Sequence, residues 1–235
     1  MVNLESGEFS TDRLRIPTPT VSTPANVADV VAQIVGHFAA DLGDGPIGIT
    51  IPAVVTHGIT RTAANIDKSW IDAPAEAIFA EALGRDIVIV NDADAAGIAE
   101  VKYGAAKDNP GLVILTTLGT GIGTAVINRG ILVPNVELGH IEIDGQDAEP
   151  VTAASARERE GLSFDEWVPR LQRYYSRLEF YMWPDLIVVG GGVSKHAKKF
   201  LPQLTLNTPI VPAALRNAAG IVGAAWLAAD RAQQA

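Results

Sequence analysis

Short, largely apolar segments that end in polar or glycine-rich loops are the feature that most constrains the fold of this chain. Four of them occupy residues 47–51, 87–90, 112–115 and 186–189. Helical patterns lie between them, including one that begins at Thr23-Pro24 and one that stops at Gly84. A strand that is apolar throughout needs cover on both faces of its sheet, so this alternation predicts an α/β protein.

Residues 116–125 predict a strand, a tight glycine loop and a second strand. Glycine can take a positive φ, and it lets backbone N–H groups approach an anion, to which threonine hydroxyls add further donors. A two-residue hairpin, with glycines chosen for turn geometry, is the alternative interpretation. The candidate phosphate ligands are Thr117, Gly119, Thr120, Gly121 and Gly123.

Three polar or glycine-rich loops follow predicted strands, after Val90, Leu115 and Val189. Ligands of open α/β sheets bind at the carboxyl ends of the strands. We therefore expect the three loops to line one cleft.

The loop after Val90 brings Asn91 and Asp92 to a strand end. Phosphoryl transfer to a hydroxyl needs a carboxylate that accepts the proton, and Asp92 opposite the glycine loop would supply it. The alternative is that Asn91 and Asp92 cap the following helix, a position that Asn and Asp favour. Both roles are compatible.

Glu137 and His140 lie three residues apart, with Gly139 between them. Together with Asn91 they offer donors and acceptors suited to vicinal hydroxyls, which indicates a polyol or a sugar. A metal site is the alternative, because His and Glu are metal ligands, although the lack of cysteine argues against structural zinc.

The glycines at 190–192 follow the last apolar segment and open a predicted helix. Gly190, Gly191, Gly192 and Lys195 are therefore candidates for a second phosphate or nucleotide loop. Two more lysines, at positions 198 and 199, would neutralise a polyanion or simply form a solvated helix face.

Composition narrows the class of protein. The 235 residues carry a formal net charge of −9, which argues against a general nucleic-acid binder, and no apolar run is long enough for a membrane span. There is no secretory leader pattern and no cysteine, so we expect a cytoplasmic protein without disulfides.

Residues 91–97 and 115–123, the pattern Glu137-x-Gly-His140 and residues 185–192 together resemble the ROK family of sugar kinases, and within it the polyphosphate glucokinases. Further similar segments are residues 54–58, 61–65, 67–70, 183–185 and 212–215, so the likeness covers nearly the whole chain.

The resemblance implies an actin-like ATPase (ribonuclease H-like) fold in two lobes. Residues 1–91 plus 218–235 would form the N-terminal lobe, and residues 92–217 the C-terminal lobe with the phosphate and sugar motifs. It also implies a cytoplasmic enzyme, a homodimer, that transfers a phosphoryl group from polyphosphate, ATP or both to the 6-hydroxyl of glucose.

Site residues carry over by motif. Asp92 would be the general base, Gly119, Thr120 and Gly121 the second phosphate motif, and Gly190, Gly191 and Gly192 the nucleotide-side loop. Phosphoryl-transfer chemistry leads us to expect Mg²⁺, although the motifs identify no residue as its ligand. We expect no zinc, because the cysteine-rich zinc motif of many ROK members is absent. The glucose ligands would be Asn65, Asn91, Asp92, Glu137, His140 and Glu149.

One departure concerns the start of the chain. The family begins with an Asp-x-Gly-Gly-Thr/Ser-type phosphate loop between two strands, and no such sequence occurs here. Residues 1–9 resemble residues 125–131 as a strand–turn–strand, but only the latter follow a strand and a phosphate loop. We expect a hairpin within residues 1–16, and we expect the first lobe to lack its N-terminal strand and loop.

Two hypotheses follow. The first is an active glucokinase, favoured by Asp92 and by the lack of a helix-turn-helix segment. The second is a non-catalytic sugar-binding ROK protein, a sensor or regulator core, or an inactive truncated kinase, favoured by the missing phosphate loop.

Overall fold

A computed structural model describes residues 1–63 and 66–234. The chain forms two compact units: unit 1 comprises Met1–Ala95 with Gly220–Ala235, and unit 2 comprises Ala96–Ala219. The lobe limits expected from the sequence, after residues 91 and 217, stay a prediction.

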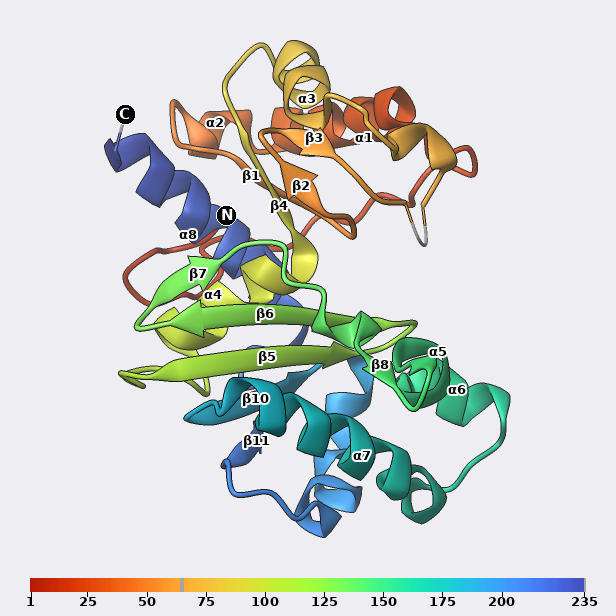
Figure 1. The fold of residues 1–235 in the computed structure, drawn as a ribbon. Coiled ribbons are helices and arrows are strands. Elements are labelled where there is room, and N and C mark those ends of the chain that lie inside the picture. Colours follow the sequence, from red (N-terminus) through yellow and green to blue (C-terminus); the bar gives the residue numbers. More distant parts are fainter. Residues whose placement is uncertain (64–65, 235) are drawn as a thin grey trace. The chain divides into compact units, whose positions relative to one another are not determined.

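Unit 2 is built on a five-stranded sheet with the strand order β11-β10-β5-β6-β7 (Figure 1). β10 runs parallel to both β5 and β11, whereas β6 runs antiparallel to β5 and β7. Thr117 of β5 pairs with Gly190 of β10 on one side and with Gly123 of β6 on the other. The two glycine loops therefore leave the same edge of this sheet. The strands are β5 (Leu112–Leu118), β6 (Ile122–Asn128), β7 (Ile131–Val133), β10 (Leu186–Gly190) and β11 (Ile210–Pro212).

Helices cover both faces of this sheet, as the apolar strands predict. On one face α7 (Phe164–Met182) buries Trp167, Leu171 and Tyr175 in the same core as Ile114 of β5. A capping box between Ser163 and Glu166 starts the helix, and the helix continues through Pro169. On the other face α4 (Asp92–Tyr103) approaches β6 closely: a Cβ on Gly97 would lie 2.6 Å from the Cβ of Ala125.

Short elements make up much of the rest of unit 2. Residues 144–163, which show no clear pattern in the sequence, contain one short strand and two short helices that lie near the glycine loop between β5 and β6. The short elements are η2 (Leu138–His140), β8 (Glu142–Ile143), β9 (Gln146–Asp147), α5 (Glu149–Thr152), α6 (Ala154–Arg159), η3 (Gly192–Lys199), η4 (Leu201–Gln203) and η5 (Arg216–Ala218).

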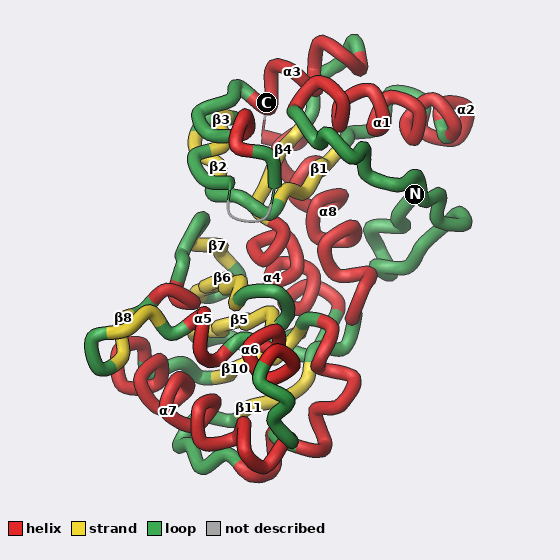
Figure 2. Tube along the Cα trace, turned by 90° about the vertical axis from the view of Figure 1, so that its right-hand side faces the viewer, coloured by secondary structure: helices red, strands yellow, loops and turns green. Residues whose placement is uncertain are grey.

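Unit 1 has a two-stranded parallel sheet of β1 (Gly48–Ile51) and β4 (Val88–Asn91). Figure 2 shows α1 and α3 side by side in this unit. Its core includes Trp70 stacked on Phe79 with ring centroids 6.1 Å apart. The other elements are α1 (Pro24–His37), α2 (Ala39–Leu42), β2 (Val55–Thr56), β3 (Ile59–Thr60), η1 (Lys68–Trp70), α3 (Ala75–Leu83) and α8 (Ala219–Gln234).

Two local predictions were wrong. The hairpin expected within residues 1–16 is reduced to one antiparallel bridge, Val2 to Phe9, because the Asn3 side chain accepts the Glu5 N–H and bends the chain into a turn. The segment around residues 209–212 contains a strand, β11, that the sequence did not suggest. β11 is an edge strand, where a proline such as Pro212 is tolerated.

Among residues 1–63 and 66–234, no helix is both long enough and apolar enough to cross a membrane.

We predict that Gly48→Ala lowers the free energy of unfolding by about 2 kcal/mol, because overpacking a core costs energy. An added Cβ would lie 2.1 Å from the Ala224 carbonyl oxygen, where α8 packs on β1. Gly220→Ala in the same helix is the control: its Cβ would meet no atom within 4 Å. Urea denaturation measures both variants, and equal stability of Gly48→Ala and the parent chain would contradict the packing described.

Candidate functional site

Asn91 and Asp92 lie where β4 ends and α4 begins. Asn91 is buried; its Oδ1 accepts the N–H groups of Ala93 at 2.8 Å and Asp94 at 3.1 Å, and its Nδ2 donates to the Ala53 carbonyl at 3.1 Å. Asp92 Oδ1 also accepts the Ala93 N–H, at 2.9 Å. The capping interpretation is therefore correct for Asn91, whereas Asp92 is the first residue of α4 and its side chain contacts the N–H of its direct neighbour.

Asp92 differs from Asn91 in its environment. Its side chain reaches solvent, yet surrounding protein atoms reduce its hydration and raise the pKa of its carboxyl, while the Ala93 N–H acts in the opposite direction. This desolvation is partial, because Asp92 is itself exposed. An exposed carboxylate with a raised pKa is suited to accepting a proton.

The loop between β5 and β6 is held by residues of α5 and α6. Ser155 donates from its backbone N–H to the Gly119 carbonyl at 3.0 Å and from its hydroxyl to the Thr120 carbonyl at 2.6 Å. The Ile122 N–H donates to Glu149 Oε2 at 2.8 Å. Within the part of the chain that the structure describes, the N–H groups of Thr120 and Gly121 donate to no other group. Two consecutive N–H donors are thus left for a ligand.

Neither Gly119 nor Gly121 has a positive φ, so this loop does not use the left-handed backbone that glycine permits. Close packing accounts for the glycine at position 121 but not for the one at position 119. A Cβ on Gly121 would lie 2.4 Å from Glu149 Oε2, whereas a Cβ on Gly119 would meet nothing within 4 Å. The connection is also longer than the two-residue turn considered as the alternative, because Leu118 pairs with Ile122.

The glycines after β10 adjoin this loop. Gly191 has a φ of 79°, and a Cβ there would lie 2.3 Å from the Leu118 carbonyl oxygen. The structure therefore brings Gly190, Gly191 and Gly192 next to the end of β5, as the sequence predicts. The helix that follows, η3, is a 3-10 helix in which Ser194 N–H donates to the Gly191 carbonyl at 3.1 Å. Lys195 is exposed on it, as are the lysines at 198 and 199.

Glu137 directly precedes η2 and His140 is its last residue, and β6 and α7 hold this short helix in place. Thr124 Oγ1 donates to the Val136 carbonyl and accepts the Leu138 N–H at 2.9 Å. A Cβ on Gly139 would lie 2.1 Å from the Ile122 carbonyl oxygen, so only glycine allows η2 to approach β6 this closely.

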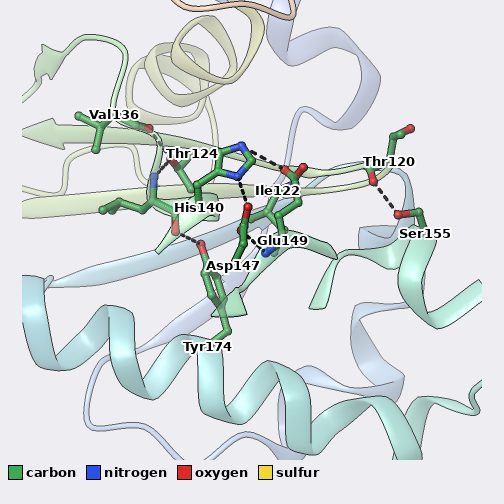
Figure 3. Close-up of polar contacts among 10 residues, drawn as sticks. Thr120, Ile122, Thr124, Val136, His140, Asp147, Glu149, Ser155 and Tyr174 are labelled. Carbon is green, nitrogen blue, oxygen red and sulfur yellow. Dashed lines mark hydrogen bonds and ion pairs between the residues drawn. The ribbon is translucent and has the colours of Figure 1, made fainter. Parts of the chain in front are cut away.

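The His140 ring faces two carboxylates, as Figure 3 shows. Its Nδ1 lies 2.9 Å from Asp147 Oδ2, and its Nε2 lies 3.9 Å from Glu149 Oε2. The hydrogen bond to Asp147 raises the pKa of His140, desolvation lowers it, and the charges of Glu149, Asp147 and Glu137 raise it further. The net direction is upward, so the pKa of His140 lies above that of a free histidine.

The structure thus joins most predicted residues of unit 2 into one network. Glu149, which the sequence resemblance placed among the glucose ligands, contacts both the glycine loop and His140. Sequence reasoning missed Asp147 and Ser155, which lie in short elements without periodicity. The available signal was the pair of carboxylates at Asp147 and Glu149, which lie two residues apart and follow His140.

Asn65 lies outside the described residues. Among the residues that the structure describes, no group of three or more His, Asp or Glu side chains could hold a metal ion, so the metal-site alternative for Glu137 and His140 gains no support.

A cavity of about 830 Å³ occurs inside unit 1, lined by α3, the start of β4 and the last turns of α8. In its lining, Arg231 lies 2.9 Å from Glu76, and Arg85 donates to the carbonyls of two loop glycines. Neither Asn91 nor Asp92 lines this cavity.

Comparison with known proteins identifies the family, because the ROK family model matches residues 2–160. The chain belongs to the ROK family. This ROK protein is 50% identical over 226 residues to the polyphosphate glucokinase of Mycobacterium tuberculosis. The alignment covers 96% of this chain and 84% of that relative.

Solved structures agree with this assignment. The inorganic polyphosphate/ATP-glucomannokinase of Arthrobacter sp. strain KM matches with a TM-score of 0.92 and 51% identity, covering 98% of this chain and 92% of that one. The ROK hexokinase of Thermus thermophilus matches with a TM-score of 0.76 and 24% identity, covering 94% of this chain and 91% of that one. The predicted α/β, actin-like ATPase fold is confirmed.

We predict that Gly121→Ala lowers the free energy of unfolding by about 1–2 kcal/mol, because the buried Ile122 N–H would lose its acceptor. The added Cβ would push the Glu149 carboxylate out of its position, 2.8 Å from that N–H. Gly119→Ala, two residues away in open space, should cost much less. Thermal or urea unfolding distinguishes them, and equal losses in the two variants would contradict this account of the loop.

Proposed function

We propose that this chain is a glucokinase that transfers a phosphoryl group from polyphosphate, ATP or both to the 6-hydroxyl of glucose. The observation that carries the proposal is the 50% identity, across 96% of the chain, to a polyphosphate glucokinase. The geometry of unit 2 supports it, because a loop with open N–H donors adjoins a cluster of His and carboxylate groups.

The phosphate side of the reaction is assigned to the glycine loops. The N–H groups of Thr120 and Gly121 would bind phosphoryl oxygens, since consecutive backbone N–H groups form an anion-binding concavity. Gly191 allows the second loop to lie against Leu118, which supports a joint role for the two loops. The full set of phosphate or nucleotide ligands that we propose is Thr117, Gly119, Thr120, Gly121, Gly123, Gly190, Gly191, Gly192 and Lys195.

The sugar side is assigned to Glu137, His140 and Glu149, with Asn91 and Asn65 as further ligands. Carboxylates accept hydrogen bonds from sugar hydroxyls, and a protonated imidazole donates them. Asn91 already uses its side-chain oxygen and one N–H within the chain, so it offers a sugar one remaining N–H.

Asp92 is assigned as the general base. As the 6-hydroxyl oxygen attacks the terminal phosphorus of the donor, its proton passes to the Asp92 carboxylate, and the bond from phosphorus to the leaving oxygen breaks. The raised pKa supports this role, because it increases the proton affinity of the carboxylate.

Mg²⁺ is proposed as the cofactor that neutralises charge on the transferring phosphoryl group. Mg²⁺ usually keeps several waters and binds through one or two carboxylates together with substrate phosphates. The lack of a three-ligand cluster among the described residues fits a metal ion that arrives with the donor. A cytoplasmic location and a homodimer remain predictions; sedimentation equilibrium tests the dimer, which a single monomeric species would refute.

The direct test is formation of glucose 6-phosphate by the purified chain, with polyphosphate and with ATP as separate donors. The proposal requires turnover with at least one of them. Glucose binding without turnover would instead favour a sugar-binding sensor or regulator. Mannose, assayed in parallel, defines the acceptor, because one similar protein is a glucomannokinase.

Asp92→Asn should lower the turnover number at least about 100-fold, because general-base catalysis typically contributes that much or more. Glucose binding should stay largely intact, since Asn keeps the shape and an acceptor for the Ala93 N–H. The parent rate should fall on acidification through the raised pKa of Asp92, because only the carboxylate accepts a proton. Turnover numbers and calorimetric glucose affinity decide the matter; unchanged turnover would refute Asp92 as the base.

The lysines at 195, 198 and 199 are proposed to bind a long polyanion. Lys195 and Lys198 lie three residues apart on a 3-10 helix and therefore on one side of it. Replacing the lysines at 198 and 199 with glutamate, and keeping Lys195 because it is also a proposed nucleotide ligand, should raise the KM for polyphosphate by about tenfold or more at low salt while the KM for ATP changes little. Equal losses for both donors would argue against a separate polyphosphate track.

A further inference from the structure

Asp147 connects the two halves of the unit 2 network. It lies at the end of β9, and its two oxygens have different partners: Oδ2 lies 2.9 Å from His140 Nδ1, and Oδ1 accepts the Glu149 N–H at 3.0 Å. The first contact orients the His140 ring, and the second holds the first residue of α5, whose side chain caps the glycine loop. Figure 3 shows Asp147 between these two residues.

The backbone around His140 is already fixed, so ring orientation is the freedom that remains. Leu138 donates to Thr124 at 2.9 Å and accepts from the Tyr174 hydroxyl at 3.3 Å, and Gly139 abuts the Ile122 carbonyl. The His140 side chain itself is about half exposed, with 47% of its surface accessible. An exposed ring on a rigid turn exchanges between several rotamers unless a partner holds one nitrogen.

The contact with Asp147 also determines which ring nitrogen is open. An ionised carboxylate only accepts hydrogen bonds, so His140 Nδ1 carries the hydrogen in this contact. The 3.9 Å separation of Nε2 from Glu149 is too long for a hydrogen bond, which leaves Nε2 for a ligand.

We propose that Asp147 is a positioning residue: by accepting the Nδ1–H of His140 it holds the ring so that Nε2 is presented to a sugar hydroxyl beside Glu149. The proposal rests on the assignment of glucose to His140. It gives Asp147 a role in binding without contact to the sugar.

Electrostatics support the same role. Three acidic groups face the ring: Asp147 from β9, Glu149 from α5 and Glu137 from the segment before η2. Their combined effect raises the pKa of His140, and the hydrogen bond to Asp147 is the largest contribution. A protonated ring donates from Nε2 while Nδ1 stays bonded to Asp147, so position and charge favour the same interaction.

The experiment compares Asp147→Asn and Asp147→Ala with Asp144→Asn. Asp144 is the matched control: it lies three residues away, pairs with Arg173 and has a φ of 54°, which Asn tolerates. NMR titration of the four histidine rings, without substrate, follows His140, and glucose kinetics and calorimetric glucose affinity are measured in parallel.

We expect both Asp147 variants to move the His140 titration to lower pH and Asp144→Asn to leave it unchanged. Asp147→Ala should raise the KM for glucose by about tenfold with a smaller change in kcat, since a hydrogen bond to a charged group contributes about that factor. Asp147→Asn, which keeps one acceptor, should retain part of the affinity.

Two results overturn the proposal. The first is that Asp147→Asn and Asp144→Asn affect the His140 titration equally. The second is that the Asp147 variants shift the His140 titration but leave the glucose affinity unchanged. Failure of the proposed function looks different, because the parent chain would then bind glucose without forming glucose 6-phosphate. The NMR titration and the calorimetric affinities would still decide the role of Asp147 in that case. A parent chain that binds no glucose overturns both.

Discussion

The hydrogen bond from the Ile122 N–H to the Glu149 carboxylate is the constraint on which the candidate site of unit 2 depends. It ties the glycine loop to α5, and its geometry leaves no room for a side chain at position 121. The same carboxylate lies 3.9 Å from His140 Nε2. Because one side chain lies next to both neighbours, the glycine loop and His140 belong to one network. We therefore expect a change at either end to reach the other through Glu149.

The sheets explain why polar residues appear where they do. In unit 2 the pairing of Thr117 with both Gly190 and Gly123 brings two glycine loops to one edge. In unit 1 the end of β4 presents Asn91 and Asp92, with Asn91 serving as the main cap of α4. Capping by Asn91 leaves Asp92 available for chemistry, which reconciles the structural and catalytic interpretations of this pair. Each feature follows from where an apolar strand ends.

Much of this arrangement was predictable from the sequence, because long apolar strands and strong caps are local signals. The strands of the unit 2 core and the helix stop at Gly84 are confirmed. The contacts of Asp147 and Ser155 were not predictable, since both residues lie in elements of two to six residues that show no periodicity. The reason for the glycine at position 121 could not be predicted from the sequence either. It is a tertiary contact with Glu149 and not a backbone angle.

The most direct measurement of the central claim is a glucose titration of the isotopically labelled chain followed by NMR. The account predicts that the Ile122 amide and the His140 ring respond together, with the same apparent affinity, because Glu149 contacts both. A response of His140 with no change at Ile122 would show that the loop and the sugar side are independent. Glucose binding that perturbs neither residue would contradict the site itself.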